Sequence, residues 1–124
     1  MTELDPSRKN LKDHLLTHAV RTGDFVLKSG RKSNWFIDGK QTACHPQGIK
    51  LVADIILSEI EGIDAIGGLT MGADPVAYGV AAIAADRGQP LRSFSIRKEA
   101  KDHGVEGRIA GALYKGDRVA IMED

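Results

Sequence analysis

Short apolar segments alternate along this chain with longer segments whose apolar residues recur at helical spacing. Three of the short segments, residues 64–69 (DAIGGL), 90–97 (PLRSFSIR) and 118–122 (RVAIM), have the composition of buried strands. A chain in which helices alternate with apolar strands is typical of a mostly parallel sheet with helices on its faces. The sequence therefore predicts an α/β fold.

Helical spacing and terminal signals predict three helices. The first covers residues 7 to 21, and the second begins at Pro46. The third has Asp74 as its N-cap, Pro75 at its first helical position and an apolar course through Ala85. We expect these helices to lie on the faces of the sheet.

Two further segments predict strands. Residues 25–38 (FVLKSGRKSNWFID) read as two short strands around the turn 29–32, which contains a glycine. Residues 111–124 (GALYKGDRVAIMED) supply either a hairpin or two separate strands. The chain shows no internal repeat and no linker.

The length and composition exclude several classes of protein. A chain of 124 residues forms one domain at most. Its 17 basic and 17 acidic residues balance, so no net field attracts nucleic acid or an anionic membrane. The single cysteine excludes an internal disulfide, and no apolar run is long enough to span a bilayer. We therefore expect a cytoplasmic protein.

Ligands of parallel sheets bind beyond the carboxyl ends of the strands, and three polar segments are predicted there. The first is residues 67–75 (GGLTMGADP), where Gly67 and Gly68 close a strand and Gly72 loosens the loop before a helix. Free backbone amides at such a turn suit a phosphate or pyrophosphate. The spacing matches neither the dinucleotide fingerprint nor a Walker loop, so an ordinary strand-to-helix turn is the alternative.

The second segment is strongly basic. Arg97 and Lys98 end a strand, and Lys101 and His103 follow in a polar loop. Arginine offers a planar fork of donors, lysine a compact charge, and histidine a proton that moves near neutral pH. Together they can neutralise an anionic ligand with several charges, although a charge run of this kind is also typical of a solvated face.

The third segment is the acidic pair Glu123 and Asp124, which follows the strand 118–122. Adjacent carboxylates can accept hydrogen bonds from sugar hydroxyls or hold a hydrated Mg²⁺. The alternative is an ordinary acidic turn.

Other candidates carry less information. His14 and His18 lie four residues apart, the spacing of a metal-binding pair on a helix, but no third ligand is evident near them in the sequence. Trp35 and Phe36 are neighbours on a strand, so one faces the core, and core packing is the default for both. Cys44 has no activating partner in the sequence, which indicates a structural or incidental residue.

Taken together, these segments resemble the orotate phosphoribosyltransferase family over nearly the whole chain. The resemblance rests on residues 25–40 (FVLKSGRKSNWFIDGK), 67–75 (GGLTMGADP), 95–104 (SIRKEAKDHG) and 119–124 (VAIMED), in the family's order and spacing. It implies a phosphoribosyltransferase-type fold, in which a mostly parallel sheet is flanked by helices. Residues 1 to about 45 then form a small helix-hairpin hood on the side of the substrate base, and residues 46–124 form the core.

The resemblance also implies site residues and roles. Lys101 and His103 match residues of a catalytic loop that covers the site. Lys28, Trp35 and Phe36 fall where the family binds orotate. The residues implied to bind phosphoribosyl pyrophosphate are Thr70, Gly72, Arg97, Lys98, Lys101, His103, Glu123 and Asp124.

The family joins orotate to phosphoribosyl pyrophosphate, which gives orotidine monophosphate and pyrophosphate in UMP biosynthesis. The resemblance therefore implies a glycosyltransferase that uses Mg²⁺. The ion is carried by the substrate, near Asp124 and without a direct protein ligand. The resemblance further implies a homodimer in which the catalytic loop closes over the partner's site, with no nucleic acid and no membrane as partners.

The family's acidic pair runs directly into a Thr- and Gly-rich loop that holds the 5′-phosphate, whereas this chain ends at Asp124. We therefore expect the C-terminal part of the domain to be missing and the 124-residue chain to lack measurable activity. Two rival interpretations stay open. One is a phosphoribosyltransferase-fold regulator that binds the ligand without chemistry, and the other is an inactive truncated fragment.

Overall fold

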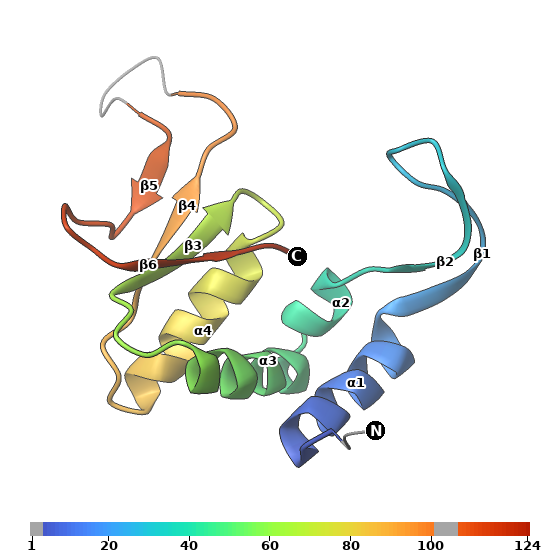
Figure 1. Cartoon of the computed structure of the whole chain (residues 1–124), viewed down its shortest axis with the longest axis horizontal. Helices are drawn as coiled ribbons and strands as arrows, with labels where there is room; N and C mark the ends of the chain where they lie inside the picture. Colours follow the sequence, from blue (N-terminus) through green and yellow to red (C-terminus); the bar gives the residue numbers. More distant parts are fainter. Residues whose placement is uncertain (1–3, 101–106) are drawn as a thin grey trace.

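The computed structural model describes residues 4–100 and 107–124. Figure 1 shows a helical and sheet body with a separate hairpin that projects from it. The elements, in chain order, are α1 (Pro6–His18), β1 (Val20–Val26), β2 (Lys32–Ile37), α2 (Lys40–Ala43), α3 (Pro46–Glu59), β3 (Ala65–Leu69), α4 (Asp74–Asp86), β4 (Arg92–Ile96), β5 (Ile109–Gly111) and β6 (Val119–Met122).

The main sheet has four strands in the order β5-β4-β3-β6. β3 is parallel to both β4 and β6, and β5 is antiparallel to β4. Since β5 and β6 occupy opposite edges, the segment 111–124 contributes to two separate strands rather than to a hairpin. The structure thus confirms the mostly parallel α/β sheet.

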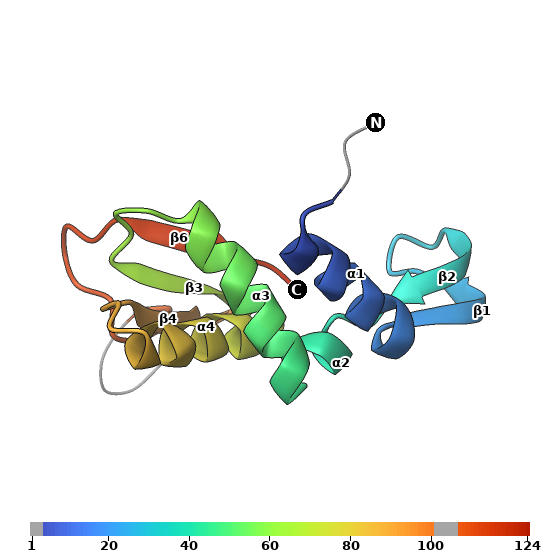
Figure 2. The same ribbon diagram turned by 90° about the horizontal axis from the view of Figure 1, so that it is seen from below.

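The core lies between this sheet and the helices α3 and α4. α4 packs on β3 and β4, and α3 packs on α4 (Figure 2). Ile66 of β3, Val80 of α4 and Ala53 of α3 are fully buried there. Full burial of a side chain such as Ile66 contributes about 1.5–3 kcal/mol relative to exposure.

The side chains of β6 alternate between the two faces of the sheet. Ala120 and Met122 pack against the core, whereas Val119 and Ile121 remain 39% and 60% exposed. Because successive strand residues point to opposite faces, the core lies on one side of β6.

The first helix ends earlier than its pattern predicts. Asp5 caps α1 by accepting a hydrogen bond from the backbone N–H of Arg8 at 2.9 Å, and the helix stops at His18. Val20 is already part of β1, where it pairs with Ile37 of β2. Pairing with a distant strand therefore overrides the local helical pattern at residues 19–21.

The predicted strands around residues 29–32 are confirmed as the antiparallel hairpin β1–β2. The backbone N–H of Leu27 donates to the carbonyl of Arg31 at 2.9 Å, which closes the turn. Gly30 lies in this turn with a φ of 85°, a conformation that other residues adopt at a cost. Figure 1 shows the hairpin tip standing away from the sheet.

The starts of α3 and α4 are built differently from each other. Pro46 is the first residue of α3, as predicted, and the His45 side chain caps this helix. Asp74 is the first residue of α4 rather than its N-cap, because Ala73 occupies that position and makes no side-chain hydrogen bond. Within residues 4–100 and 107–124, no helix has both the length and the apolar character needed to cross a membrane.

Candidate active site

The carboxyl ends of the parallel strands β3, β4 and β6 lie together at one end of the sheet, the carboxyl edge. The register pairs Gly68 of β3 with Met122 of β6, and Leu69 of β3 with Ile96 of β4. The segments that follow these strands are therefore level with one another. This arrangement gathers the predicted residues Thr70, Gly72, Arg97, Lys98, Glu123 and Asp124 at a common edge.

Asp124 is held in place from two sides. Its Oδ2 atom accepts a hydrogen bond from Nζ of Lys40, on α2, at 2.5 Å. This hydrogen bond lowers the pKa of Asp124 and favours the ionised carboxylate. A side chain at Gly72 would collide with the same carboxylate, so the glycine leaves room for the acid. Asp124 remains partly exposed and reachable from solvent.

Asp74 fastens the loop between β3 and α4 to its surroundings. Its Oδ2 accepts from the hydroxyl of Thr70 at 2.5 Å, and its Oδ1 accepts from the hydroxyl of Ser95 on β4 at 2.8 Å. Tyr78 is hydrogen-bonded to the same serine hydroxyl. The loop contains a cis peptide bond between Thr70 and Met71. These contacts hold the loop at the end of β3.

The basic end of β4 is tied to β5. The backbone N–H of Arg97 donates to the carbonyl of Arg108 at 2.6 Å, and Nε of Arg108 donates to the carbonyl of Arg97 at 2.7 Å. Arg97 is half-buried and Lys98 is exposed. Arg108 is thus a further cation near this edge, which the sequence analysis did not single out. Lys101 and His103 lie outside the described residues.

The predicted orotate-binding residues lie on the hairpin rather than on the sheet. Lys28 is an exposed residue of the turn, and Trp35 is 53% exposed, so core packing was wrong for this side chain. Phe36 is half-buried and packs edge-to-face against Phe25, with 4.7 Å between ring centroids. In Figure 1 the hairpin tip is separated from the carboxyl edge of the sheet. The structure therefore places the predicted residues on two parts of the fold, with Lys28, Trp35 and Phe36 on the hairpin and the others after the strands of the sheet.

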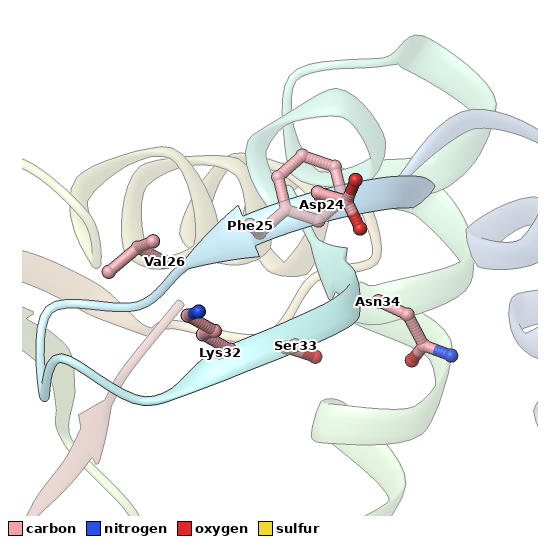
Figure 3. A pocket seen from close by; sticks show the side chains of 6 residues that line it. All are labelled: Asp24, Phe25, Val26, Lys32, Ser33 and Asn34. Atoms are coloured by element: carbon pink, nitrogen blue, oxygen red, sulfur yellow. The ribbon is translucent and has the colours of Figure 1, made fainter.

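A hollow of about 520 Å³ lies on the hairpin itself. Figure 3 shows the side chains around it, from both strands. Its lining residues are Asp24, Phe25, Val26, Lys32, Ser33 and Asn34. Only one of these, Lys32, is a cation, so the hollow lacks the clustered positive charge that a pyrophosphate group requires. The hollow therefore does not suit such a group.

A second cluster, of three imidazole rings, was not predicted. His45, at the start of α3, lies beside His14 and His18 of α1, with 4.7 and 4.9 Å between ring centroids. Burial, followed by the neighbouring His18 and His45 rings, lowers the pKa of His14. The sequence analysis found no third ligand because His45 reaches the pair only through the packing of α1 on α3.

Comparisons with known proteins found relatives of this chain in sequence and in structure. A scan against protein-family models gave no match. The orotate phosphoribosyltransferase of Nostoc sp. is 42% identical over 119 residues, which cover 94% of this chain and 58% of that protein. The orotate phosphoribosyltransferase of Streptomyces avermitilis is 37% identical over 123 residues, which cover 98% of this chain and 68% of that protein.

Solved structures give the same result. The Mycobacterium tuberculosis orotate phosphoribosyltransferase in complex with Fe(III) dicitrate superposes with a TM-score of 0.79 at 33% identity, over 96% of this chain and 67% of that one. The same enzyme in complex with phosphoribosyl pyrophosphate gives a TM-score of 0.72 at 28% identity, over 96% of this chain and 65% of that one.

The chain spans about three fifths of the length of the first curated relatives that it matches. Over that length the sequence identity and the superposed structures agree with one family. The chain belongs to the orotate phosphoribosyltransferase family.

Proposed function

We propose that this chain forms the phosphoribosyl pyrophosphate side of an orotate phosphoribosyltransferase that acts in UMP biosynthesis. The observation that carries the proposal is the meeting of Asp124, the Thr70–Gly72 loop and Arg97 at one sheet edge. A relative with this fold is known in complex with phosphoribosyl pyrophosphate, which supports the same ligand here. The single cysteine and balanced charge fit a cytoplasmic enzyme.

In this reaction a ring nitrogen of orotate forms a bond to the anomeric carbon of the ribose. The bond from that carbon to the pyrophosphate oxygen breaks, and pyrophosphate leaves with the electron pair. Positive charge develops on the ribose and negative charge on the leaving group. Fixed charges that match this pattern stabilise the transition state.

The described residues supply both kinds of charge. Arg97 and Lys98 follow β4, where their cations suit the leaving pyrophosphate. The loop offers the backbone amides of Met71 and Gly72, whereas that of Thr70 donates to the carbonyl of Ile96. Asp74 keeps the loop in place. Lys101 and His103 complete the cationic set in this proposal, as the loop that covers the reacting centre.

The acidic pair serves the ribose. Lys40 occupies Oδ2 of Asp124 and orients the carboxylate, so that its partly exposed oxygens can accept hydrogen bonds from ribose hydroxyls. Glu123 is exposed beside it. Carboxylates placed here also favour the positive charge that develops on the sugar.

Magnesium fits this edge as an ion bound to the substrate. The edge offers the ionised carboxylate of Asp124 together with Glu123, and oxygen donors of this kind suit a hard cation. Mg²⁺, when bound, neutralises charge on the pyrophosphate. No direct protein ligand is required, since the ion retains water and phosphate oxygens around it.

The base side belongs to the hairpin in this proposal. Lys28 provides a charge for the orotate carboxylate, and Trp35 and Phe36 provide aromatic surfaces beside the base. A homodimer with a shared active site would bring a partner's catalytic loop over each sheet edge. The exposed apolar residues of the hairpin, Val26, Leu27, Trp35 and Ile37, support such an association.

Calorimetric titration of the 124-residue chain with phosphoribosyl pyrophosphate and Mg²⁺ tests the binding assignment. A charge-assisted hydrogen bond contributes about 1.5–3 kcal/mol, so we expect Arg97→Ala and Asp124→Asn each to weaken binding about 10- to 100-fold. Arg87→Ala, at the far end of α4, is the matched control and should bind normally. Equal affinities in all three variants would exclude this edge.

Orotate consumption then separates an enzyme from a pure binding protein. The measurement uses the longest form of the protein that the gene encodes, together with the 124-residue chain. Turnover that requires orotate, phosphoribosyl pyrophosphate and Mg²⁺ supports the proposed reaction. Tight binding without turnover in the longest form would instead indicate a regulator that senses the ligand.

A further inference from the structure

The three histidine rings between α1 and α3 are close enough to share one ligand. The ring centroids of His14 and His18 are 4.3 Å apart, and His45 lies within 4.9 Å of both. One ring nitrogen from each residue lies within 4.8 Å of those of the other two. Within residues 4–100 and 107–124, no other group of three potential metal ligands lies as close together.

His14 is the buried member of the cluster, with 8% of its surface exposed. Its Nδ1 lies 3.0 Å from the hydroxyl of Thr42, on α2, and this contact orients the ring. Its Nε2 is buried and has no hydrogen-bond partner among the described residues. A buried polar nitrogen without a hydrogen-bond partner is uncommon in native proteins, and a bound ion or water molecule is one of its recognised explanations.

The other two rings come from two different helix ends, His18 from the end of α1 and His45 from the start of α3. His45 uses Nδ1 to accept a hydrogen bond from the backbone N–H of Gln47 at 3.2 Å, which caps α3. His18 is exposed at the end of α1, so the cluster opens toward solvent on that side. Their spacing on one helix face explains the closeness of His14 and His18, and the packing of α1 on α3 brings His45 to them.

We propose that His14, His18 and His45 form a binding site for a divalent late transition-metal ion of the Zn²⁺ class. Neutral imidazole nitrogen is the ligand that such ions take most often in proteins. Three protein ligands with an open fourth position for water is a common zinc arrangement. The contact between His14 and Thr42 is the type of outer contact that holds a metal-binding ring in orientation.

The geometry needs only small side-chain adjustments to accept the ion. A tetrahedral zinc with Zn–N bonds of about 2.0–2.1 Å places its nitrogen ligands about 3.3–3.4 Å apart. The exposed His18 ring can rotate to close the remaining distance. His45 must offer a free lone pair, and coordination through either ring nitrogen replaces its capping hydrogen bond from Gln47. Nδ1 then either binds the ion or carries the ring proton while Nε2 binds it.

This site is separate from the Mg²⁺-dependent chemistry proposed above, and it stands whether or not that proposal holds. Imidazole ligands favour zinc over magnesium, which prefers oxygen ligands. The site joins α1, which carries two of its ligands, to His45 at the start of α3, so a bound ion would clip the N-terminal hood to the core.

The test uses the 124-residue chain produced without a polyhistidine tag. Calorimetric titration with Zn²⁺ should show one ion per chain, and Co²⁺ should give the visible absorption of a four-coordinate site. The unfolding temperature should rise with free Zn²⁺, because the ion binds the folded state in preference. Mg²⁺ in excess should not displace either ion.

Variants locate the ion without removing the buried ring. His18→Gln changes an exposed residue, and His45→Asn deletes a ligand while keeping a side chain that favours the N-cap position. Each should weaken Zn²⁺ binding at least about tenfold, since even outer-contact changes cost about 10- to 100-fold. Lys12→Gln, on the exposed surface of α1, is the control and should bind as the unaltered chain does.

Two results would overturn the proposal. One is the absence of saturable Zn²⁺ binding in the unaltered chain, which would leave a histidine cluster that packs without an ion. The other is unchanged binding in both His18→Gln and His45→Asn, which would place the ion elsewhere.

Discussion

Asp117 joins the turn before β6 to the start of β4. Its Oδ2 and Oδ1 atoms accept hydrogen bonds from the guanidinium of Arg92 at 2.6 and 2.8 Å, and the backbone N–H of Tyr114 donates to Oδ2 at 2.7 Å. The Tyr114 ring lies 4.1 Å from Cζ of Arg92. The hydrogen bond from Arg92, followed by that from Tyr114, lowers the pKa of Asp117.

This pair predicts a pH dependence of stability. Because the folded-state pKa of Asp117 is depressed, its contribution is present above the unfolded-state pKa of about 3.9 and is lost as pH falls through the folded value. Asp117→Asn should lower the free energy of unfolding at pH 7 and flatten its decline in acid. Urea unfolding at pH 7 and in acid measures both effects. Asp86→Asn, an exposed acid on α4, is the control, and an equally flat profile for it would contradict the assignment.

Gly72 gives a second prediction, which concerns the site. A Cβ at this position would meet the carboxylate of Asp124, so Gly72→Ala should displace that acid and weaken binding of phosphoribosyl pyrophosphate about tenfold. Gly39→Ala is a close control, since its Cβ would make only an ordinary 3.7 Å contact with the backbone of Asp124. Calorimetry on both variants checks the result. Equal affinities would show that the carboxylate position is unimportant.

The sequence predicted the strands better than it predicted the helix boundaries. The apolar run 64–69 forms the buried central strand β3, so its pattern carries over directly to the structure. The run 118–122 also forms a strand, but β6 is the last strand of the sheet and is not buried as its composition predicted, since Val119 and Ile121 are exposed. The end of α1 depends instead on Val20 pairing with Ile37, which no local pattern records. The four-residue helix α2 is too short to give a periodic signal.

The candidate site was predictable to the same degree. The strands' carboxyl ends identified the edge, because parallel strands bring their ends together. The partners of those residues were not predictable, since Lys40 reaches Asp124, and Ser95 reaches Asp74, through tertiary packing. For Asp74 the capping rule predicted the start of α4 to within one residue, but Asp74 is the first helical residue and not the N-cap.

The helix-covered face of the sheet and its opposite face predict unequal losses of stability when an isoleucine is shortened to alanine. Ile66 on β3 is fully buried, whereas Ile121 on β6 is 60% exposed. Ile66→Ala should therefore lower the free energy of unfolding by about 2–5 kcal/mol. Ile121→Ala, the matched change, should alter it by only about 0.5 kcal/mol. Chemical denaturation of both variants checks this, and similar losses would indicate that something covers Ile121 in solution.

The molecule as a whole has a body and a projecting hairpin (Figure 1). The hairpin carries large apolar side chains that are exposed, including Val26 at 73% and Trp35 at 53%. Surfaces of this kind are typical of places where proteins associate. The shared-site dimer proposed above would cover them.

Sedimentation equilibrium at micromolar concentration tests this association. We expect a two-fold dimer for the unaltered chain and a shift toward monomer for Trp35→Glu, which puts a charge into the apolar surface. Lys9→Glu, an exposed change on α1, should leave the dimer intact. A clean monomer of the unaltered chain over the whole concentration range would contradict the shared site.

The single-turn helix α2 stands between the two clusters described above. Its Lys40 donates to Asp124, and its Thr42 contacts His14. A helix of four residues does not persist alone in water, so its order comes from these two contacts and from its packing on α1, α3 and α4. The effective concentration of the Lys40 ammonium at Asp124 is therefore set partly by the N-terminal helix. Loss of the contact between His14 and Thr42 would let α2 move, so that Lys40 spends less time beside Asp124. The pKa of Asp124 would then rise toward that of a free acid, although no atom of the sheet edge has been changed.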